Sequence, residues 1–479
     1  MITFHLAWTT LIACLGTFQF GYHLSELNSS ERVITCKVKI PGSAPTYEDS
    51  FWGSRNYKEC IPMTSEDYAI ATCIFSLGGL LSSTVAGSLA NKLGRKKVCF
   101  IYSMFYCIGG YVMMTSNTLF ELDLGRFISG LAAGSYLVIT PMLINEVTPV
   151  DHRGFLGSLS QAAVAFGILI SQLISYKYTN NQQWRNIFCF SMILGAANFL
   201  LLFTTCESPK WLTLKSKYDE AFYTLSYLRY TENEIHEDLS HWKSLHLNRS
   251  SKASTPLLQS VHELSVDPYV SISIKEFLTR PNFRGQLRAV MICMTASQLT
   301  GINSITFYGV NILANLLPEN VLLVNLIISI FNFCSCLTVS RFIDKVGRKP
   351  LLSLSIVMMG VSSFFITVGL VLNQSLICVA FVLIFVIGYS MGLGAIPFLI
   401  VSEFTRHDCV GAAQSIGGTL NWISTLLLAY LFPILKDRIL HDYVFLIFTI
   451  ICAIYFVLCN KFIPETRGKP TFEEVWDLQ

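Results

Sequence analysis

The feature that most constrains this chain is a succession of apolar segments, each about as long as a membrane-spanning helix. A helix needs ~20 mostly apolar residues to cross ~30 Å of hydrocarbon, where every backbone polar group must be satisfied internally. About twelve segments meet this requirement, near residues 4–24, 68–90, 98–116, 121–144, 156–176, 187–205, 287–312, 320–342, 350–371, 376–402, 413–434 and 442–461. The sequence therefore predicts an all-α, polytopic membrane protein with twelve transmembrane helices.

The composition excludes several other classes of protein. Hydrophobic residues make up 52% of the 479 residues and charged residues only 14%, whereas soluble domains carry about 25% charged residues. The 34 basic and 31 acidic residues form no basic stripe interleaved with aromatic side chains, so we expect no nucleic-acid partner. The sequence contains no zinc-protease, serine-hydrolase or P-loop motif, so we expect no enzymatic activity, no cofactor and no metal.

A polar stretch divides the apolar segments into two groups of six. Residues 207–286 are too charged to cross a bilayer, and we expect a cytoplasmic linker of intracellular helices there. The linker separates an N-terminal six-helix bundle, residues 1–206, from a C-terminal six-helix bundle, residues 287–462, which a short tail follows at residues 463–479.

Charged landmarks recur in the two halves at nearly one offset. The matching positions are Gly94 and Gly347, Glu146 and Glu403, and Glu207 and Glu465, at offsets of 253, 257 and 258 residues. Two parallel six-helix repeats indicate a transporter whose substrate site lies where the halves meet.

The distribution of basic residues predicts the orientation. Short loops rich in Lys and Arg stay in the cytoplasm, and such loops lie at residues 91–97 and 341–349. Both termini are therefore expected to be cytoplasmic. The long loop that begins near Ser25 would be outside, together with the glycosylation sequons at Asn28 and Asn373. The membrane itself, plasma membrane or vacuole, is left open.

Several motifs together resemble the sugar porter family of the major facilitator superfamily. They are Gly87 to Lys96 and its repeat Asp344 to Lys349, Gly125-Arg126, Arg153-Gly154, Glu207-Ser-Pro-Lys-Trp211, Gln298-Leu-Thr-Gly-Ile-Asn303 and Pro464-Glu465-Thr-Arg-Gly468. The stretch Phe20 to Asn28 is similar to a fungal, vacuole-associated branch of that family. The resemblance implies transport by alternating access.

Charged residues at the cytoplasmic helix ends predict a latch. Arg and Glu there can form pairs that cross-link neighbouring helices and close the cytoplasmic side while the site faces outward. We expect Arg153 to pair with Glu146 or Glu207, and Arg348 to pair with Glu403 or Glu465. The candidate latch residues are Arg95, Glu146, Arg153, Glu207, Arg348, Glu403 and Glu465. The alternative is that they only anchor the topology.

Uncharged polar side chains within the spans predict the transport site. A neutral polyol needs hydrogen-bonding groups on fixed elements and an aromatic face for its C–H surface. The candidates, which match the family's sugar-contacting positions, are Gln161, Gln298, Asn303, Asn332, Phe398, Asn421 and Trp422. The resemblance also implies an outer gate at Phe307 and Tyr308. The alternative is that lone amides only join neighbouring helices.

The tenth span departs from the glucose-carrier pattern. Gly392, Gly394 and Pro397 predict a helix that bends. Ser390, Ala395 and Phe398 stand where the family carries a polar or acidic group, a proline and a tryptophan, and Ser297 replaces a glutamine in span seven. The expected partner is therefore a small neutral sugar or polyol, with hexose left open.

Residues in spans one and four bear on proton coupling. In proton-coupled relatives an Asp follows Phe-Gly-Tyr and pairs with the arginine of span four, whereas here His23 follows and would face Arg126. The salt-bridge switch is then missing, which favours facilitated diffusion, and Asp123 would neutralise Arg126 instead. The alternatives are a proton symporter that uses His23, or a nutrient sensor or vacuolar sorting factor that does not transport.

Two of the fifteen cysteines differ from the others in their setting. Most lie in apolar segments, where cysteine behaves as a small hydrophobe. Cys36 and Cys60 lie in the long polar loop, and if that loop faces an oxidising compartment they are candidates for a disulfide. The lipid bilayer is the other expected partner, and we expect the protein to function as a monomer.

Overall fold

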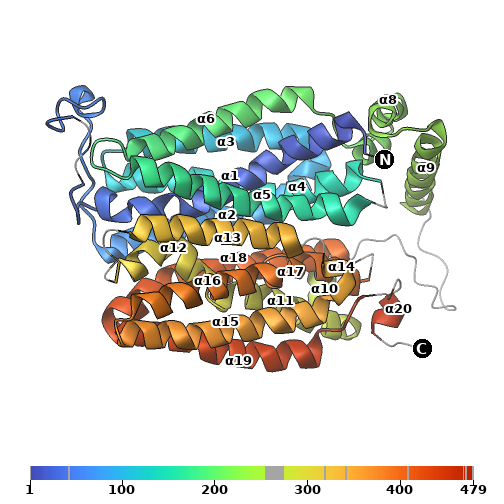
Figure 1. Cartoon of the computed structure of the whole chain (residues 1–479). Helices are drawn as coiled ribbons and strands as arrows, with labels where there is room; N and C mark the ends of the chain where they lie inside the picture. The colour runs from blue at the N-terminus through green and yellow to red at the C-terminus, as the bar shows by residue number, and fades with distance from the viewer. Residues whose placement is uncertain are drawn as a thin grey trace.

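The computed structural model describes residues 2–40, 42, 44–149, 152–253, 274–314, 316–317, 320–339, 342–406, 409–467, 469 and 472–476. Its regular secondary structure over these residues is helical, and most of the helices lie side by side in two bundles (Figure 1). The all-α prediction is confirmed.

The first bundle consists of the long helices α1 (Phe4–Ile34), α2 (Ser65–Leu93), α3 (Arg95–Thr115), α4 (Leu119–Val147), α5 (Arg153–Tyr178) and α6 (Arg185–Leu201). Their ends follow capping rules, because Thr64 with Asp67 and Thr118 with Glu121 form capping boxes at the starts of α2 and α4. Each box satisfies amide groups that a helix start leaves without partners.

The helices that connect the two bundles along the chain lie at the end that also carries both termini (Figure 1). They are η3 (Leu202–Thr204), α7 (Pro209–Leu214), α8 (Tyr218–Leu228), α9 (Glu232–Ala253), α10 (Ile274–Thr279) and η4 (Pro281–Phe283). The loop between α1 and α2 lies at the opposite end of the molecule, which we call the outer end; it contains η1 (Gly53–Arg55).

The second bundle contains two interrupted spans. Its helices are α11 (Arg284–Leu299), α12 (Ile302–Leu313), α13 (Val321–Val339), α14 (Ile343–Val346), α15 (Arg348–Val371), α16 (Ser375–Met391), α17 (Ile396–Phe404), α18 (Val410–Ile434), η5 (Leu435–Leu440), η6 (His441–Tyr443), α19 (Val444–Phe462) and α20 (Phe472–Val475). Gly301, at φ +104°, separates α11 from α12. Residues 392–395 separate α16 from α17, where the sequence predicts a bend.

Nine helical stretches among the described residues are long and apolar enough to cross a membrane, and one of them holds both α18 and α19. Helix α1 fails this test because polar side chains interrupt it. The α11–α12 pair fails because the break at Gly301 leaves helices of 16 and 12 residues, each too short to cross alone. In α1 the polar side chains include Gln19, His23 and Glu26, which are buried against the rest of the bundle rather than exposed. A span lined by protein can carry such groups, so apolarity alone undercounts the spans.

The first span is longer than expected, and this corrects the sequence interpretation. The prediction placed its end near residue 24 with a loop from Ser25, but α1 continues to Ile34 and buries Asn28, Ser29 and Glu31. The sequon at Asn28 is therefore inside the bundle and not on an outer loop. Asn373, by contrast, is exposed in the turn between α15 and α16.

Candidate functional site

A cavity lies between the two bundles, walled by α1, α4 and α5 on one side and by α11–α13 and α16–α18 on the other. All seven residues predicted to bind the solute line it: Gln161, Gln298, Asn303, Asn332, Phe398, Asn421 and Trp422. None of the described side chains in its lining carries a full charge. Such a lining suits a neutral polar solute, because an ion would lose its hydration without gaining an opposite charge.

The interruption of span seven brings two of the amides together. Helix α11 ends just after Gln298 and α12 begins just before Asn303. The Asn303 amide donates to Oε1 of Gln298 at 2.7 Å and lies 3.4 Å from Oγ1 of Thr425 in α18. Gly301 is required at the break, because a Cβ there would lie 2.7 Å from the ring of Phe448. The broken helix therefore holds a preformed polar corner in the cavity.

The two serines that depart from the family pattern hold neighbouring asparagines. The Asn421 amide donates to Oγ of Ser297 at 2.8 Å. The Ser390 hydroxyl donates to Oδ1 of Asn332 at 2.7 Å. Each hydrogen bond holds one end of the asparagine side chain and thereby orients the other end. The oriented groups are Oδ1 of Asn421 and the amide nitrogen of Asn332. Ser297 and Ser390 thus fix which hydrogen-bonding groups the asparagines can offer to a solute.

Aromatic rings form an apolar part of the wall. Trp422 meets Phe20 of the first bundle edge to face, with ring centroids 5.8 Å apart. Both rings line the cavity, so they offer a surface for the C–H face of a sugar ring.

The cavity is open toward the end that carries the termini. Phe398, in its lining, is 40% exposed. A Cβ added at Gly411 or Gly418 of α18 would meet no atom within 4 Å. Ser415 on the same helix is exposed and Gln414 is half-buried, and such polar side chains suit an aqueous cleft better than a lipid surface.

The cavity is closed at the outer end, where the predicted gate residues lie. Phe307 and Tyr308 are buried in α12, outside the cavity lining. The Tyr308 hydroxyl donates to the carbonyl of Ala429 at 2.6 Å, and its ring stacks on Phe432. The Tyr308 ring also meets Tyr68 of α2 edge to face at 5.9 Å. Tyr308 therefore contacts both bundles at the outer end.

Asn28 joins the bundles at this closed end, and sequence reasoning missed it. Its Oδ1 accepts from the backbone amide of Val310 at 3.0 Å, and its amide lies 3.5 Å from the carbonyl of Ile305. Both partners belong to α12. The sequence offered a signal, since a lone Asn in a span suggests a helix contact, but the residue was interpreted as a sequon.

A second missed contact joins α5 to α13. Oε1 of Gln172 accepts from the amide of Asn325 at 2.6 Å and from the hydroxyl of Ser29. Both amides line the cavity on its outer side. The rule that identified Gln161 applies equally to Gln172 and Asn325, so the signal was present in the sequence.

A buried carboxylate adds a further contact between the bundles. Oε1 of Glu31 in α1 accepts from Lys37 at 3.2 Å and from the amide of Asn311 in α12 at 3.1 Å. Lys436 in η5 lies 3.3 Å from the backbone oxygen of Asn311. These contacts would have to break for the outer end to open.

The expectation that Arg126 lacks a carboxylate partner in span one is wrong. Nη1 of Arg126 lies 3.0 Å from Oε1 of Glu26 and donates to the backbone oxygen of His23 at 2.7 Å. Nδ1 of His23 bonds the same carboxylate oxygen at 2.9 Å, and the imidazole stacks on Tyr106. Glu26 lies one helical turn after His23, so it occupies the same face of α1. No ion pair of Asp123 with Arg126 occurs among the described side chains.

The cytoplasmic latch residues form the same arrangement in each half. Arg95 bonds both carboxylate oxygens of Glu146 at 2.8 Å. Arg348 bonds both oxygens of Glu403 at 3.0–3.3 Å. Glu146 therefore pairs with Arg95; the side chain of Arg153 lies outside what the structure describes. Each pair lies within its own bundle, Arg95–Glu146 in the first and Arg348–Glu403 in the second. Both ion pairs are formed although the cavity is open toward the same end of the molecule.

The remaining two latch carboxylates cap helices. Glu207 accepts from the backbone amides of Arg95 and Lys96 at the start of α3, and Glu465 accepts from those of Arg348 and Lys349 at the start of α15. A carboxylate at a helix N-terminus is favoured by the helix dipole. Burial raises the pKa of Glu207 above its ordinary value, and the amide donors oppose that rise.

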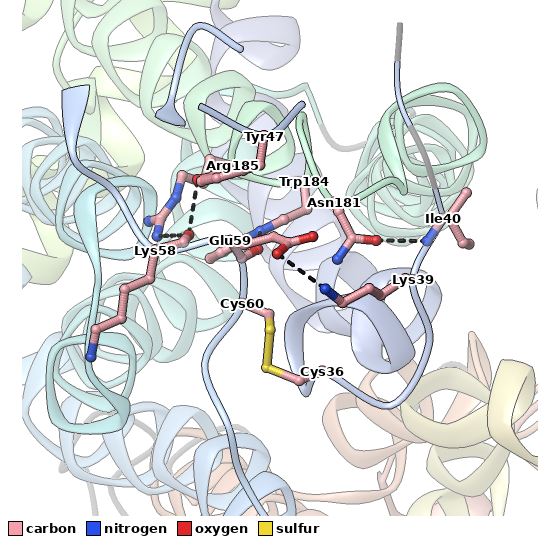
Figure 2. Close-up of a disulfide and its surroundings, with 10 residues drawn as sticks. All are labelled: Cys36, Lys39, Ile40, Tyr47, Lys58, Glu59, Cys60, Asn181, Trp184 and Arg185. Carbon is pink, nitrogen blue, oxygen red and sulfur yellow. Dashed lines mark hydrogen bonds and ion pairs between the residues drawn. A yellow bond between two sulfur atoms is a disulfide. The ribbon is translucent and has the colours of Figure 1, made fainter. Parts of the chain in front are cut away.

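A disulfide joins Cys36 to Cys60 in the outer loop (Figure 2). Polar contacts hold this loop to the first bundle: the Arg185 guanidinium donates to the carbonyl of Lys58 at 2.9 Å, and the amide of Ile40 donates to Oδ1 of Asn181 at 2.6 Å. The loop thus forms a cap that ties the outer end of α1 to the segment that precedes α2.

Comparison with known proteins gives consistent matches along the whole chain. The family described as sugar (and other) transporter matches residues 9–477. The probable metabolite transport protein YBR241C of Saccharomyces cerevisiae is 35% identical over 99% of this chain and 96% of its own length. The vacuolar protein sorting-associated protein 73 of the same yeast is 34% identical, over 97% and 95%.

A solved structure shows the same fold. The proton:xylose symporter XylE of the major facilitator superfamily, bound to 6-bromo-6-deoxy-D-glucose, superposes with a TM-score of 0.74 at 20% identity and covers 99% of each chain. The two bundles described above are therefore those of the twelve-span major facilitator fold.

Proposed function

This chain belongs to the sugar (and other) transporter family, and from that membership we propose that it carries a neutral sugar or polyol across a membrane by alternating access, as a facilitator. The observation that carries the proposal is the uncharged cavity between the bundles, which gathers the amides of Gln161, Gln298 and Asn303 beside the rings of Phe20 and Trp422. Hydrogen-bonding groups and an aromatic face on rigid helices match the two surfaces of a sugar ring.

The conformation supports a rocking cycle. The outer end is closed by contacts between the bundles at Asn28, Gln172 and Glu31, while the opposite end is open. For a solute to enter the cavity from the outer end, these contacts between the bundles must break and the opposite end must close. Because the ion pairs Arg95–Glu146 and Arg348–Glu403 lie within single bundles, we propose that they keep each bundle rigid as it rocks.

The charge balance around Arg126 favours uncoupled transport. Glu26 neutralises the guanidinium without any proton, and none of Arg126, Glu26 or His23 lines the cavity. The second candidate is a proton symporter. It is favoured by one observation: Oε1 of Glu26 contacts both the guanidinium of Arg126 and the imidazole of His23. A carboxylate and an imidazole thus offer two proton acceptors in the bundle core.

The expected membrane and orientation remain part of the proposal. We propose that both termini are cytoplasmic, that the protein functions as a monomer, and that it resides in the vacuolar membrane. The vacuolar assignment rests on the relative named as a vacuolar protein sorting-associated protein. The same name makes a sorting factor or sensor that does not transport a further candidate, because the cavity residues would serve either a carried or a sensed solute.

The test is uptake by purified protein in sealed proteoliposomes. Radiolabelled pentoses, hexoses and polyols are presented singly, with and without an imposed pH gradient. Saturable uptake that ceases at the external concentration supports a facilitator, and accumulation driven by the gradient supports the symporter. Absence of flux for the whole panel, with ligand binding retained, supports the sensor.

A further inference from the structure

Helix α8 has two opposite apolar faces, of which only one is buried. The buried face packs against α7 and α9 in a small cluster of its own. Its residues are Ala221 and Leu225. Leu228, which is also buried, packs instead with Leu6 of α1 and Val147 of α4 in the first bundle. The opposite face consists of Tyr223 and Tyr227, four residues apart, with Tyr230 just beyond the end of the helix. We call these three side chains the tyrosine face.

The tyrosine face is not typical of a helix surrounded by water, which carries polar residues away from its core. Tyr223 is 64% exposed, and the other two tyrosines are exposed as well. The rings of Tyr223 and Tyr227 lie 5.0 Å apart, and their hydroxyls share a hydrogen bond of 2.6 Å. A contiguous exposed aromatic surface of this kind marks a contact with something outside the described chain.

The tyrosine face is continuous with the first turns of α1. The ring of Tyr227 meets His5 edge to face at 5.1 Å, and the carbonyl of Tyr227 accepts from the Thr3 hydroxyl at 3.0 Å. The Tyr230 hydroxyl donates to the carbonyl of Ile2 at 3.3 Å. Figure 1 shows α8 beside the N-terminus, with α9 farther from the bundle.

The adjoining surface of α1 faces lipid. Phe4 is 75% exposed, its ring stacks on Trp8 one turn later, and Leu11 continues the stripe in an exposed position. These residues follow the i, i+4, i+7 spacing of one helix face. Since α1 is the first span of the fold, this stripe meets the acyl chains, and its first turn lies at the boundary of the bilayer.

From this continuity we propose that the tyrosine face of α8 lies in the headgroup region of the leaflet on the side of the termini, so that α8 is a membrane-surface helix. Tyrosine suits that depth, because its ring is apolar and its hydroxyl can reach water or headgroup oxygens. The helix lies along the surface with its other face covered by α7 and α9. The bilayer, not a second protein, is therefore the occupant of this face.

Site-specific photocrosslinking of the full-length protein in phosphatidylcholine nanodiscs tests the proposal. The photoreactive residue p-benzoylphenylalanine replaces Tyr223 in one variant and Tyr230 in a second, so that one position remains if the other fails to fold. The matched control carries it at Glu237, an exposed position on α9. After irradiation, mass spectrometry of the digested protein measures the yield of lipid adduct.

We expect at least a tenfold higher yield of phospholipid adduct at position 223 or 230 than at position 237. Equal yields at the three positions would overturn the proposal, since α8 would then be no closer to the bilayer than α9. Adducts to a second copy of the chain, without lipid adducts, would overturn it as well and would identify a protein interface. Neither readout depends on transport activity.

Discussion

Nη1 of Arg126 lies 3.0 Å from Oε1 of Glu26, and both side chains are at most 1% exposed. A buried charge is tolerated where an opposite charge meets it, and loss of one partner leaves the other uncompensated. The pair therefore joins α1 to α4 at the core of the first bundle, and it replaces the histidine–arginine contact that the sequence suggested.

We predict that Glu26→Gln destabilises the protein by about 3–5 kcal/mol, the cost of an unpaired buried charge. Thermal unfolding of the purified protein in detergent measures the loss. Glu66→Gln is the control, because Glu66 pairs with Arg438 at the exposed surface, where such a pair contributes about 0–1 kcal/mol. An equal lowering of the unfolding temperature in Glu26→Gln and Glu66→Gln would contradict the buried pair. The double variant Glu26→Gln/Arg126→Gln should lose less stability than the sum of the losses in the two single variants.

The two latch pairs should differ in strength. Glu146 is 10% exposed beside Arg95, whereas Glu403 is 25% exposed beside Arg348. Solvent screens the second pair more, so Glu146→Gln should lower the unfolding temperature by more than Glu403→Gln. The two variants control each other, since they occupy matching positions of the repeat. A larger loss for Glu403→Gln would show that burial does not rank the pairs.

Gln161 should contribute to solute affinity without supporting the fold. It lines the cavity, and no hydrogen bond of its side chain occurs among the described residues. Gln161→Ala removes one hydrogen bond to the solute, about 0.5–1.5 kcal/mol, and should raise the half-saturation concentration roughly two- to tenfold. Gln182→Ala, which changes an amide bonded to Ala44 in the outer loop, should leave it unchanged. An unaltered half-saturation concentration for Gln161→Ala would remove Gln161 from the binding site.

The outer cap should depend on its disulfide. Cys36→Ser opens the bridge to Cys60, and loss of a native disulfide costs about 2–5 kcal/mol in small domains. We expect a lower unfolding temperature, measured under non-reducing conditions. Cys334→Ser, which changes an exposed free cysteine, serves as the control and should have little effect. A reducing agent should lower the unfolding temperature of the wild-type protein to that of Cys36→Ser and no further. An unfolding temperature for Cys36→Ser equal to that of the wild-type protein would contradict a stabilising role of the outer cap.

The cavity residues could be predicted because uncharged amides and an aromatic ring are unusual within apolar spans. The sequence analysis predicts one continuous span at residues 287–312, however, and the break at Gly301 between Gln298 and Asn303 appears only in the structure. The same polarity misled the interpretation of α1, where Glu26 and Asn28 suggested a loop although they face the protein interior. Sequence polarity reports contact with a polar environment, and it does not distinguish water from a neighbouring helix.

The sequence predicts which charged residues lie at the cytoplasmic helix ends, but it does not predict which of them form pairs. Several Arg and Glu residues lie at the cytoplasmic helix ends, and their spacing fits more than one partner. The structure pairs Glu146 with Arg95 because α3 and α4 are neighbours in the bundle. Helix order in space decides such pairs, and the sequence carries no direct signal for it.

Counterflow in proteoliposomes tests the central claim most directly. Vesicles that hold purified protein are loaded with one unlabelled sugar or polyol and diluted into the same labelled solute, without any gradient of pH. A carrier that alternates between two open states predicts transient accumulation of label above the external concentration, lost in vesicles without protein. Binding of the solute without counterflow, for every member of the panel, would contradict transport by alternating access.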